Sequence, residues 1–162
     1  MITNGTLHEI AERARALANA GQVYGRGWSL AQICDHLARS IDNTVKGSAV
    51  HGTSLRSRRL TRCGRMKRWG FKRYMLWTGW FPAGVPAPES VRPADDVPLE
   101  EALAKLRAAA GAFERTCAQA DPSWSEHSYL GRFSARGWRR FHHIHAAHHF
   151  SFLRGEPGTA VP

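Results

Sequence analysis

The sequence predicts an all-α protein, a bundle of four or five amphipathic helices with a long proline-rich crossover loop. Apolar residues recur every three or four positions in several long stretches, which is the spacing of one helix face. No stretch alternates convincingly between apolar and polar residues in the manner of a β-strand. Prolines crowd residues 81–98, where each removes a backbone donor and restricts the residue before it. Helices joined by such a loop imply a bundle that the loop crosses.

Start signals define the first two helices. Thr6 and Glu9 have the spacing of a capping box, and the apolar face that follows ends near Gly21. The second helix has the stronger signal, because Ser29 is a good N-cap and Gln32 lies three residues later. Its predicted core stripe consists of Leu30, Ile33, Leu37, Ile41 and Val45.

A strongly basic stretch follows a predicted turn at residues 47–53. Arginines and lysines are interleaved with aromatic residues over 56–73, and the net charge of the chain is +10. We expect a third helix here, interrupted or reset around Gly70. Such a helix could hold phosphates or stack on bases. The commoner situation is a solvated cationic face whose Arg and Lys stems lie over apolar neighbours, and the sequence favours it.

The second half of the chain predicts two more helices. One opens after Asp95 and Asp96, with Pro98 in its first turn. Its apolar residues step by four and three, as in a helix that packs against near-parallel neighbours: Leu99, Leu103, Leu106, Ala110, Phe113 and Cys117. A connector over 124–132 follows, and Ser134 caps the last helix.

Length and composition predict one domain over residues 1–162, with a disordered tail from about residue 155. No run of about 18 apolar residues predicts a membrane span. The first residues lack the apolar core of a secretory signal. The cysteines Cys34, Cys63 and Cys117 lie far apart and form no C-x-x-C pair. We therefore expect a cytoplasmic protein without membrane contacts.

The last helix is rich in histidine, the commonest nitrogen ligand of transition metals. On a helical wheel His145 and His148 lie inside the apolar stripe, His142 and His149 at its edge, and His143 points outward. A pair at helical spacing can bind one ion, although spacing does not choose between His145/His149 and His145/His148. Buried histidines bonded to carbonyls are the alternative interpretation. A pair is too few for a tight site, so a third ligand must come from elsewhere.

Three segments carry a family resemblance. The first segment contains WSL at 28–30 and HLARSI at 36–41, and the second is the proline-rich FPAGVPAPE at 81–89. The chain closes on W-x-x-F-H-x-x-H-x-x-H-H-x-S-F-L from Trp138 to Leu153. Over residues 5–154 the chain thus resembles a branch of unknown function within the DinB-like superfamily of metal-binding proteins.

The resemblance implies a four-helix bundle with a divalent ion held at one end by His36, His145 and His149. The helical wheel alone places His36 on the flank of its helix, which favours a solvated or half-buried ring. Three imidazoles without a carboxylate suit zinc or nickel. The chain departs from the pattern after His149, because many relatives carry Gln shortly after the last ligand and Phe150 to Phe152 follow here.

This ligand set predicts a metal-dependent enzyme that acts on a small molecule. Superfamily members of known activity include thiol-dependent transferases and hydrolase-like proteins, so the resemblance implies hydrolysis or thiol transfer, with a low-molecular-weight thiol as the substrate in the latter case. His148 and His127 are candidate acid/base groups, with packing or surface exposure as the alternative. The competing hypothesis is a nucleic-acid-associated protein with a structural or vestigial metal site. Trp77 or Trp80 could serve a homodimer contact.

Overall fold

The computed structural model describes residues 5–25, 27–45, 62–82, 84, 86–127 and 129–154. Within these residues it has five α-helices: α1 (His8–Asn19), α2 (Leu30–Val45), α3 (Arg62–Thr78), α4 (Leu99–Cys117) and α5 (Ala135–Phe150). A 3-10 turn, η1 (Glu89–Val91), lies between α3 and α4. Two short strands pair antiparallel: β1 (Tyr24–Gly25) and β2 (Leu153–Arg154). The predicted all-helical character is confirmed, and strands of two residues are too short to show alternation.

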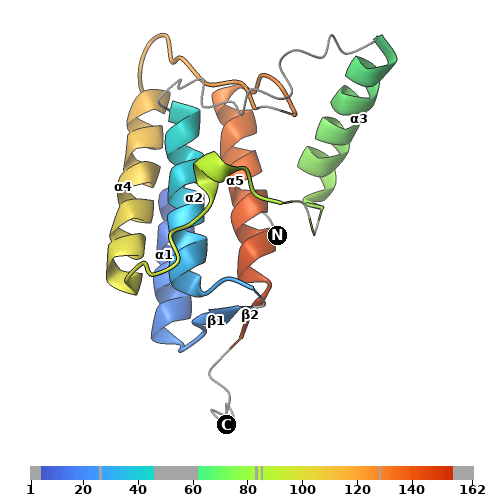
Figure 1. The fold of residues 1–162 in the computed structure, drawn as a ribbon. Coiled ribbons are helices and arrows are strands. Elements are labelled where there is room, and N and C mark those ends of the chain that lie inside the picture. The colour runs from blue at the N-terminus through green and yellow to red at the C-terminus, as the bar shows by residue number, and fades with distance from the viewer. Residues whose placement is uncertain are drawn as a thin grey trace.

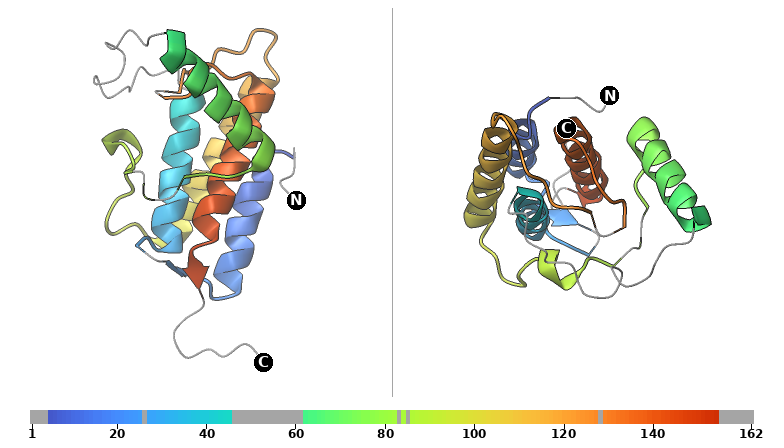
Figure 2. Two further views of the ribbon diagram at one scale, coloured as in Figure 1. Left: turned by 90° about the vertical axis from the view of Figure 1, so that its right-hand side faces the viewer. Right: turned by 90° about the horizontal axis from the view of Figure 1, so that it is seen from above.

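Four of the helices enclose the core. Helices α1, α2, α4 and α5 lie side by side, with α2 packed against both α4 and α5 (Figures 1 and 2). Their facing side chains are fully buried, and each large one contributes about 1.5–3 kcal/mol to the free energy of unfolding. They include much of the predicted stripe of α2 and the predicted seam of α4: Leu30, Ile33, Leu37, Ile41, Leu103, Leu106 and Phe113.

The helix caps agree with the sequence at two of three positions. The Ser29 amide donates to Gln32 Oε1 at 3.0 Å and the Gln32 amide to Ser29 Oγ at 3.3 Å, so the capping box of α2 is confirmed. Ser134 Oγ accepts from the Gly137 amide and caps α5. The start predicted near Thr6 is correct to within two residues, because α1 begins at His8, but the N-cap is Leu7 and makes no side-chain cap, so the capping box predicted at Thr6 is wrong.

Helix α3 differs from its prediction in being continuous through Gly70. Glycine costs only about 1 kcal/mol inside a helix relative to alanine, and the exposed Gly70 has no neighbour that would break the turn. The helix lies at the outside of the molecule, next to α5 (Figure 2). The turn predicted at 47–53, the basic residues before Arg62 and the tail from about 155 lie outside the described residues.

The crossover loop runs from the end of α3 across α5 and α2 to the start of α4 (Figure 1). As its prolines predict, the described part of the loop contains no α-helix and only the turn η1. This path brings a backbone segment against α2 and places it over the histidines of α5. Among the described residues, no helix is long and apolar enough to cross a membrane.

Candidate metal centre

Three histidines from two helices converge between α2 and α5. His36 comes from the middle of α2, and His145 and His149 lie one turn apart on α5. His145 Nε2 lies 3.1 Å from His36 Nε2 and 3.0 Å from His149 Nε2. One ligand atom from each ring can be chosen so that all lie within 4.8 Å of one another. His36 and His145 are buried, and His149 is half-buried, so the group is open to solvent on the His149 side.

These separations suit ligands of a single ion. Two nitrogens that are each about 2.0–2.1 Å from one metal lie about 3.3 Å apart at a tetrahedral angle and about 3.0 Å apart at a right angle. The nitrogens of His145 and its two neighbours are at such a spacing. The three-histidine group could therefore hold a metal ion.

The proton positions also favour a shared cation. The Val91 carbonyl can only accept, so His36 Nδ1, at 2.7 Å from it, carries the proton and His36 Nε2 presents a lone pair. A proton on His145 Nε2 can be donated to only one of its two imidazole neighbours. Among the described residues, buried His145 Nδ1 has no hydrogen-bond partner. An arrangement of facing nitrogen lone pairs is relieved when a cation lies among them.

Burial keeps the three rings neutral. It lowers the pKa of His149 to about 3, helped by the neighbouring His36 and His148. It lowers the pKa of His145 well below its usual value, again helped by the adjacent imidazoles. The pKa of His36 is lowered by burial, against the opposing effects of the Val91 carbonyl and Asp35. Neutral imidazole is the form that binds metals, so the site needs no deprotonation near neutral pH.

Aromatic side chains form the walls of the group. The Trp28 ring lies 4.9 Å from that of His36 and is stacked 5.7 Å from that of His149, centroid to centroid. On the other side Phe81, at the start of the crossover loop, stacks on His145 at 5.1 Å. An apolar shell of this kind limits water access and strengthens electrostatic interactions with a bound ion.

The crossover loop is fastened to α2 beside the first histidine. The Asp35 carboxylate accepts from the Ala94 amide at 3.1 Å, while His36 donates to Val91. Asp35 is 1% exposed and also accepts from Arg39 Nε at 2.8 Å. Burial raises the pKa of Asp35, but Arg39, the Ala94 amide and nearby charges outweigh it, and the pKa is lowered overall. The carboxylate is therefore charged and holds the loop that orients His36.

The two candidate acid/base histidines have different surroundings. The half-buried His148 ring lies 5.3 Å from that of His149 and 5.1 Å from Phe81, so it borders the group. Burial lowers its pKa, which leaves it neutral and able to accept a proton. His127 lies in the connector, where its Nδ1 accepts the Tyr129 and Leu130 amides, both at 3.1 Å.

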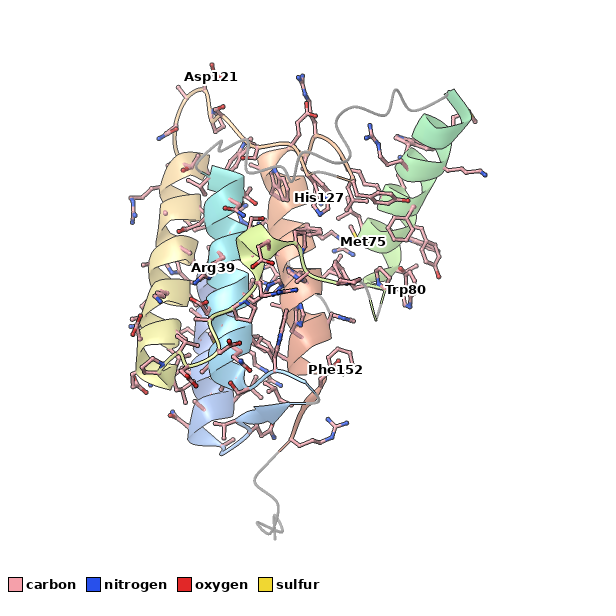
Figure 3. All side chains as sticks on the ribbon, viewed as in Figure 1. Arg39, Met75, Trp80, Asp121, His127 and Phe152 are labelled. Carbon is pink, nitrogen blue, oxygen red and sulfur yellow. The ribbon has the colours of Figure 1, made fainter. Side chains whose placement is uncertain are left out.

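The structure does not bring His127 to the metal group. Its ring packs against Phe141 at 5.1 Å and Trp138 at 6.1 Å, towards the Ser134 end of α5. Figure 3 shows it close to the connector at that end of the molecule. The surroundings of His127 are those of a residue that organises the turn.

Two expectations from the helical wheel are wrong. His36 is 3% exposed and not solvated, because the crossover loop covers the flank of α2 on which it lies. His143 does not point into solvent, because its Nε2 donates to the Gly5 carbonyl at 3.0 Å under the N-terminal segment. Both errors arise because a wheel treats one helix and ignores the loops that cover it.

Two residues that support the ligands are not predicted in that role. The sequence indicates Trp28 only as a residue that flanks the cap of α2 and as part of a motif, and it singles out no role for Asp35. The sequence does contain a signal for Asp35, because an acidic residue between Cys34 and His36 in an otherwise apolar part of the helix must have a charged or hydrogen-bonding partner if it is buried. The partner of His36, the Val91 carbonyl, has no side-chain signature that a sequence could reveal.

Comparisons with known proteins give a family but no activity. The model of a family described as "Protein of unknown function (DUF1569)" matches residues 2–156. No curated protein and no solved structure matches the chain. Any assignment of function therefore depends on the geometry of the histidine group.

Proposed function

The chain belongs to the DUF1569 family, and from its histidine group we propose that it is a divalent-metal-dependent enzyme acting on a small molecule. The ligands are His36, His145 and His149, with zinc or nickel as the ion. The observation that carries the proposal is the convergence of three neutral imidazoles from two helices, without a fourth protein ligand among the described residues. Three protein ligands and a free position are the pattern of catalytic rather than structural sites.

We further propose, from the opening and closing sequence motifs, that the chain belongs to a branch of the DinB-like superfamily. The proposal treats α1, α2, α4 and α5 as its four-helix bundle, in one domain with α3 and the crossover loop. The opening and closing motifs support it, since they contain the residues that converge here: His36 in the first, and His145 and His149 in the second. The thiol-transfer reaction and the low-molecular-weight thiol enter through this resemblance.

The residues around the ion would have separate roles in orienting a ligand, excluding water and accepting a proton. A bound divalent ion lowers the pKa of a water ligand towards about 7, or binds a thiolate. His36 is held in its ligating orientation by the Val91 carbonyl. Trp28 and Phe81 exclude water from the buried sides. In this proposal His148, neutral and beside His149, would accept a proton from the attacking group.

Metal content is the first test. The protein, purified without chelator and supplied with zinc or nickel, is expected to hold about one ion per chain by elemental analysis. His145→Ala and His149→Ala should abolish binding while the helical circular dichroism persists. His143→Gln is the matched control, because it changes a histidine of the same helix that is bonded to Gly5 instead. Absence of metal from the wild-type protein, or equal loss in the control, would refute the proposal.

A second measurement separates the two reactions. In the cobalt-substituted protein, addition of a low-molecular-weight thiol is expected to produce a sulfur-to-cobalt charge-transfer band if the substrate is a thiol. If the reaction is hydrolysis, we expect no such band, and we expect turnover of activated esters or amides. His148→Gln should then reduce this turnover without loss of metal. A metal-loaded protein that shows neither the band nor turnover would argue for a structural site.

A further inference from the structure

Helix α3 has a cationic and aromatic outer face that the histidine group does not use. The helix contains no Asp or Glu, and its basic residues are Arg62, Arg65, Lys67, Arg68, Lys72 and Arg73. Large apolar side chains on α3 and just after it are exposed to solvent: Met66 (68%), Trp69 (62%), Tyr74 (52%), Trp77 (81%) and Trp80 (51%). So many exposed large apolar groups on one element mark a binding surface.

Two hollows lie along this helix. One, of about 450 Å³, is formed by Arg68, Trp69 and Lys72 against Gly131 and Arg132 of the connector. The other has a similar volume of about 450 Å³ and is lined by Arg73, Tyr74, Leu76 and Trp77. Both combine cationic and aromatic groups. Burial and the neighbouring Arg68 charge lower the pKa of Lys72, so an anion in the first hollow would relieve repulsion between like charges.

The helix is attached to the protein through its inner face and its carbonyls. Met75 on its inner face is buried, at 1% exposed. Arg140 of α5 donates to the Leu76 carbonyl and, at 3.3 Å, to the Trp77 carbonyl. Lys72 donates to the Arg132 carbonyl and lies 3.8 Å over the Phe133 ring. These contacts fix the inner side of α3 to α5 and its flanking connector, and the helix lies apart from α1 and α4 (Figures 2 and 3).

We infer that the outer face of α3 binds single-stranded nucleic acid. Trp69, Arg73 and Trp77 are four residues apart and form one row along the helix. The Arg73 guanidinium lies 4.9 Å over the Trp69 ring, in the middle of this row. Alternating aromatic rings and guanidinium planes are stacking partners for successive bases, and the surrounding cations neutralise phosphates.

Other occupants fit less well. A helix that inserts into a lipid surface places its charges at the flanks of the apolar face, whereas Arg73 lies at its centre. A second copy of the chain would bring the same uncompensated cations against each other. The net charge of +10 complements a polyanion.

Fluorescence anisotropy with labelled oligothymidylate and oligouridylate tests the inference. Trp69→Ala combined with Trp77→Ala should weaken binding of both strands by about ten-fold or more, because stacking contributes substantially per base. Lys67→Gln combined with Arg68→Gln should reduce the slope of log K against log salt by about 1.4, since each phosphate contact contributes about 0.7. Arg13→Gln combined with Arg115→Gln is the control of equal net charge, on the exposed faces of α1 and α4.

We expect weaker strand binding in both α3 variants and wild-type strand binding in the control. Circular dichroism verifies that each variant is folded, and His149→Ala should retain strand binding because it alters only the proposed metal site. Any of four results would overturn the inference: no binding of either strand, equal losses in the control, tighter binding of duplex than of single strands, or binding of phosphatidylserine vesicles without binding of strands.

Discussion

Replacement of Asp35 by asparagine is expected to weaken both the fold and metal binding. This carboxylate links the crossover loop to α2 at the residue before His36. It accepts from Arg39 at 2.8 Å and from the Ala94 amide at 3.1 Å, and it lies 3.5 Å from Lys105 Nζ. Asparagine keeps the shape of the side chain but removes the charge, and its amide group would face a cation.

The contacts set the size of the effect. Breaking a fully buried ion pair costs about 3–5 kcal/mol, but the Arg39 and Lys105 side chains are 44% and 43% exposed, so solvent screens them. We expect Asp35→Asn to lower the free energy of unfolding by about 2 kcal/mol, as for hydrogen bonds to charged groups. Loss of a hydrogen bond that orients a metal-ligating side chain weakens metal binding by about 10–100-fold. Asp35 acts on His36 through the loop, so the lower end of this range applies.

Two measurements check this prediction. Urea unfolding with a chelator present gives the stability of the metal-free protein, and competition with a chromophoric chelator gives the zinc affinity. Glu100→Gln is the control, because its pair with Arg15 is on the surface, with side chains 74% and 40% exposed, so solvent screens it and its loss should change stability little. If Asp35→Asn lost stability but kept wild-type zinc affinity, the loop would not orient His36. Unchanged stability would contradict the role of the carboxylate itself.

Two further predictions concern buried rings. Trp28→Ala should expose His149 and raise its pKa from about 3 towards its usual value, which an NMR titration of the ring proton would report; an unchanged pKa would contradict the role of Trp28 as a wall. Burial also lowers the pKa of His142 from 6.5 to about 3, so protons bind the unfolded state first and stability falls with pH below about 6.5, by about 1.4 kcal/mol per pH unit. In urea unfolding with chelator, His142→Gln should reduce the slope by about 1.4 kcal/mol per pH unit, because the other buried histidines with lowered pKa values still contribute to it. The same pH dependence in both proteins would refute the assignment.

Much of the fold follows from local signals that act within one helix. The capping box at Ser29 and the apolar steps of α2 and α4 depend on contacts along a helix and between near-parallel neighbours, and both are preserved in the structure. The interruption predicted at Gly70 is wrong because the local preference of a single glycine is weak. Such a residue takes the helical conformation that its neighbours impose.

The site was predictable only in part. The spacing of His145 and His149 is a property of one helix, and it indicated a pair without deciding among the histidines nearby. The place of His36 depends on how α2 packs against α5 and on the loop that covers it, and a helical wheel contains neither. The family resemblance proposed His36, and the packing explains why the wheel opposed it.

The crossover loop connects the two regions for which we propose functions. Trp80 belongs to the aromatic surface of α3, 6.3 Å from Phe71 and 6.2 Å from Tyr74, and the next residue, Phe81, stacks on His145. We therefore expect a change that releases Trp80 to shift the adjacent Phe81, which forms part of the wall of the metal group. The Trp77 side chain is 81% exposed and lies four residues before Phe81 in the sequence. Trp80→Ala should thus weaken zinc binding several-fold in the chelator competition, whereas Trp77→Ala should not, and equal affinities in the two variants would show that the regions act independently.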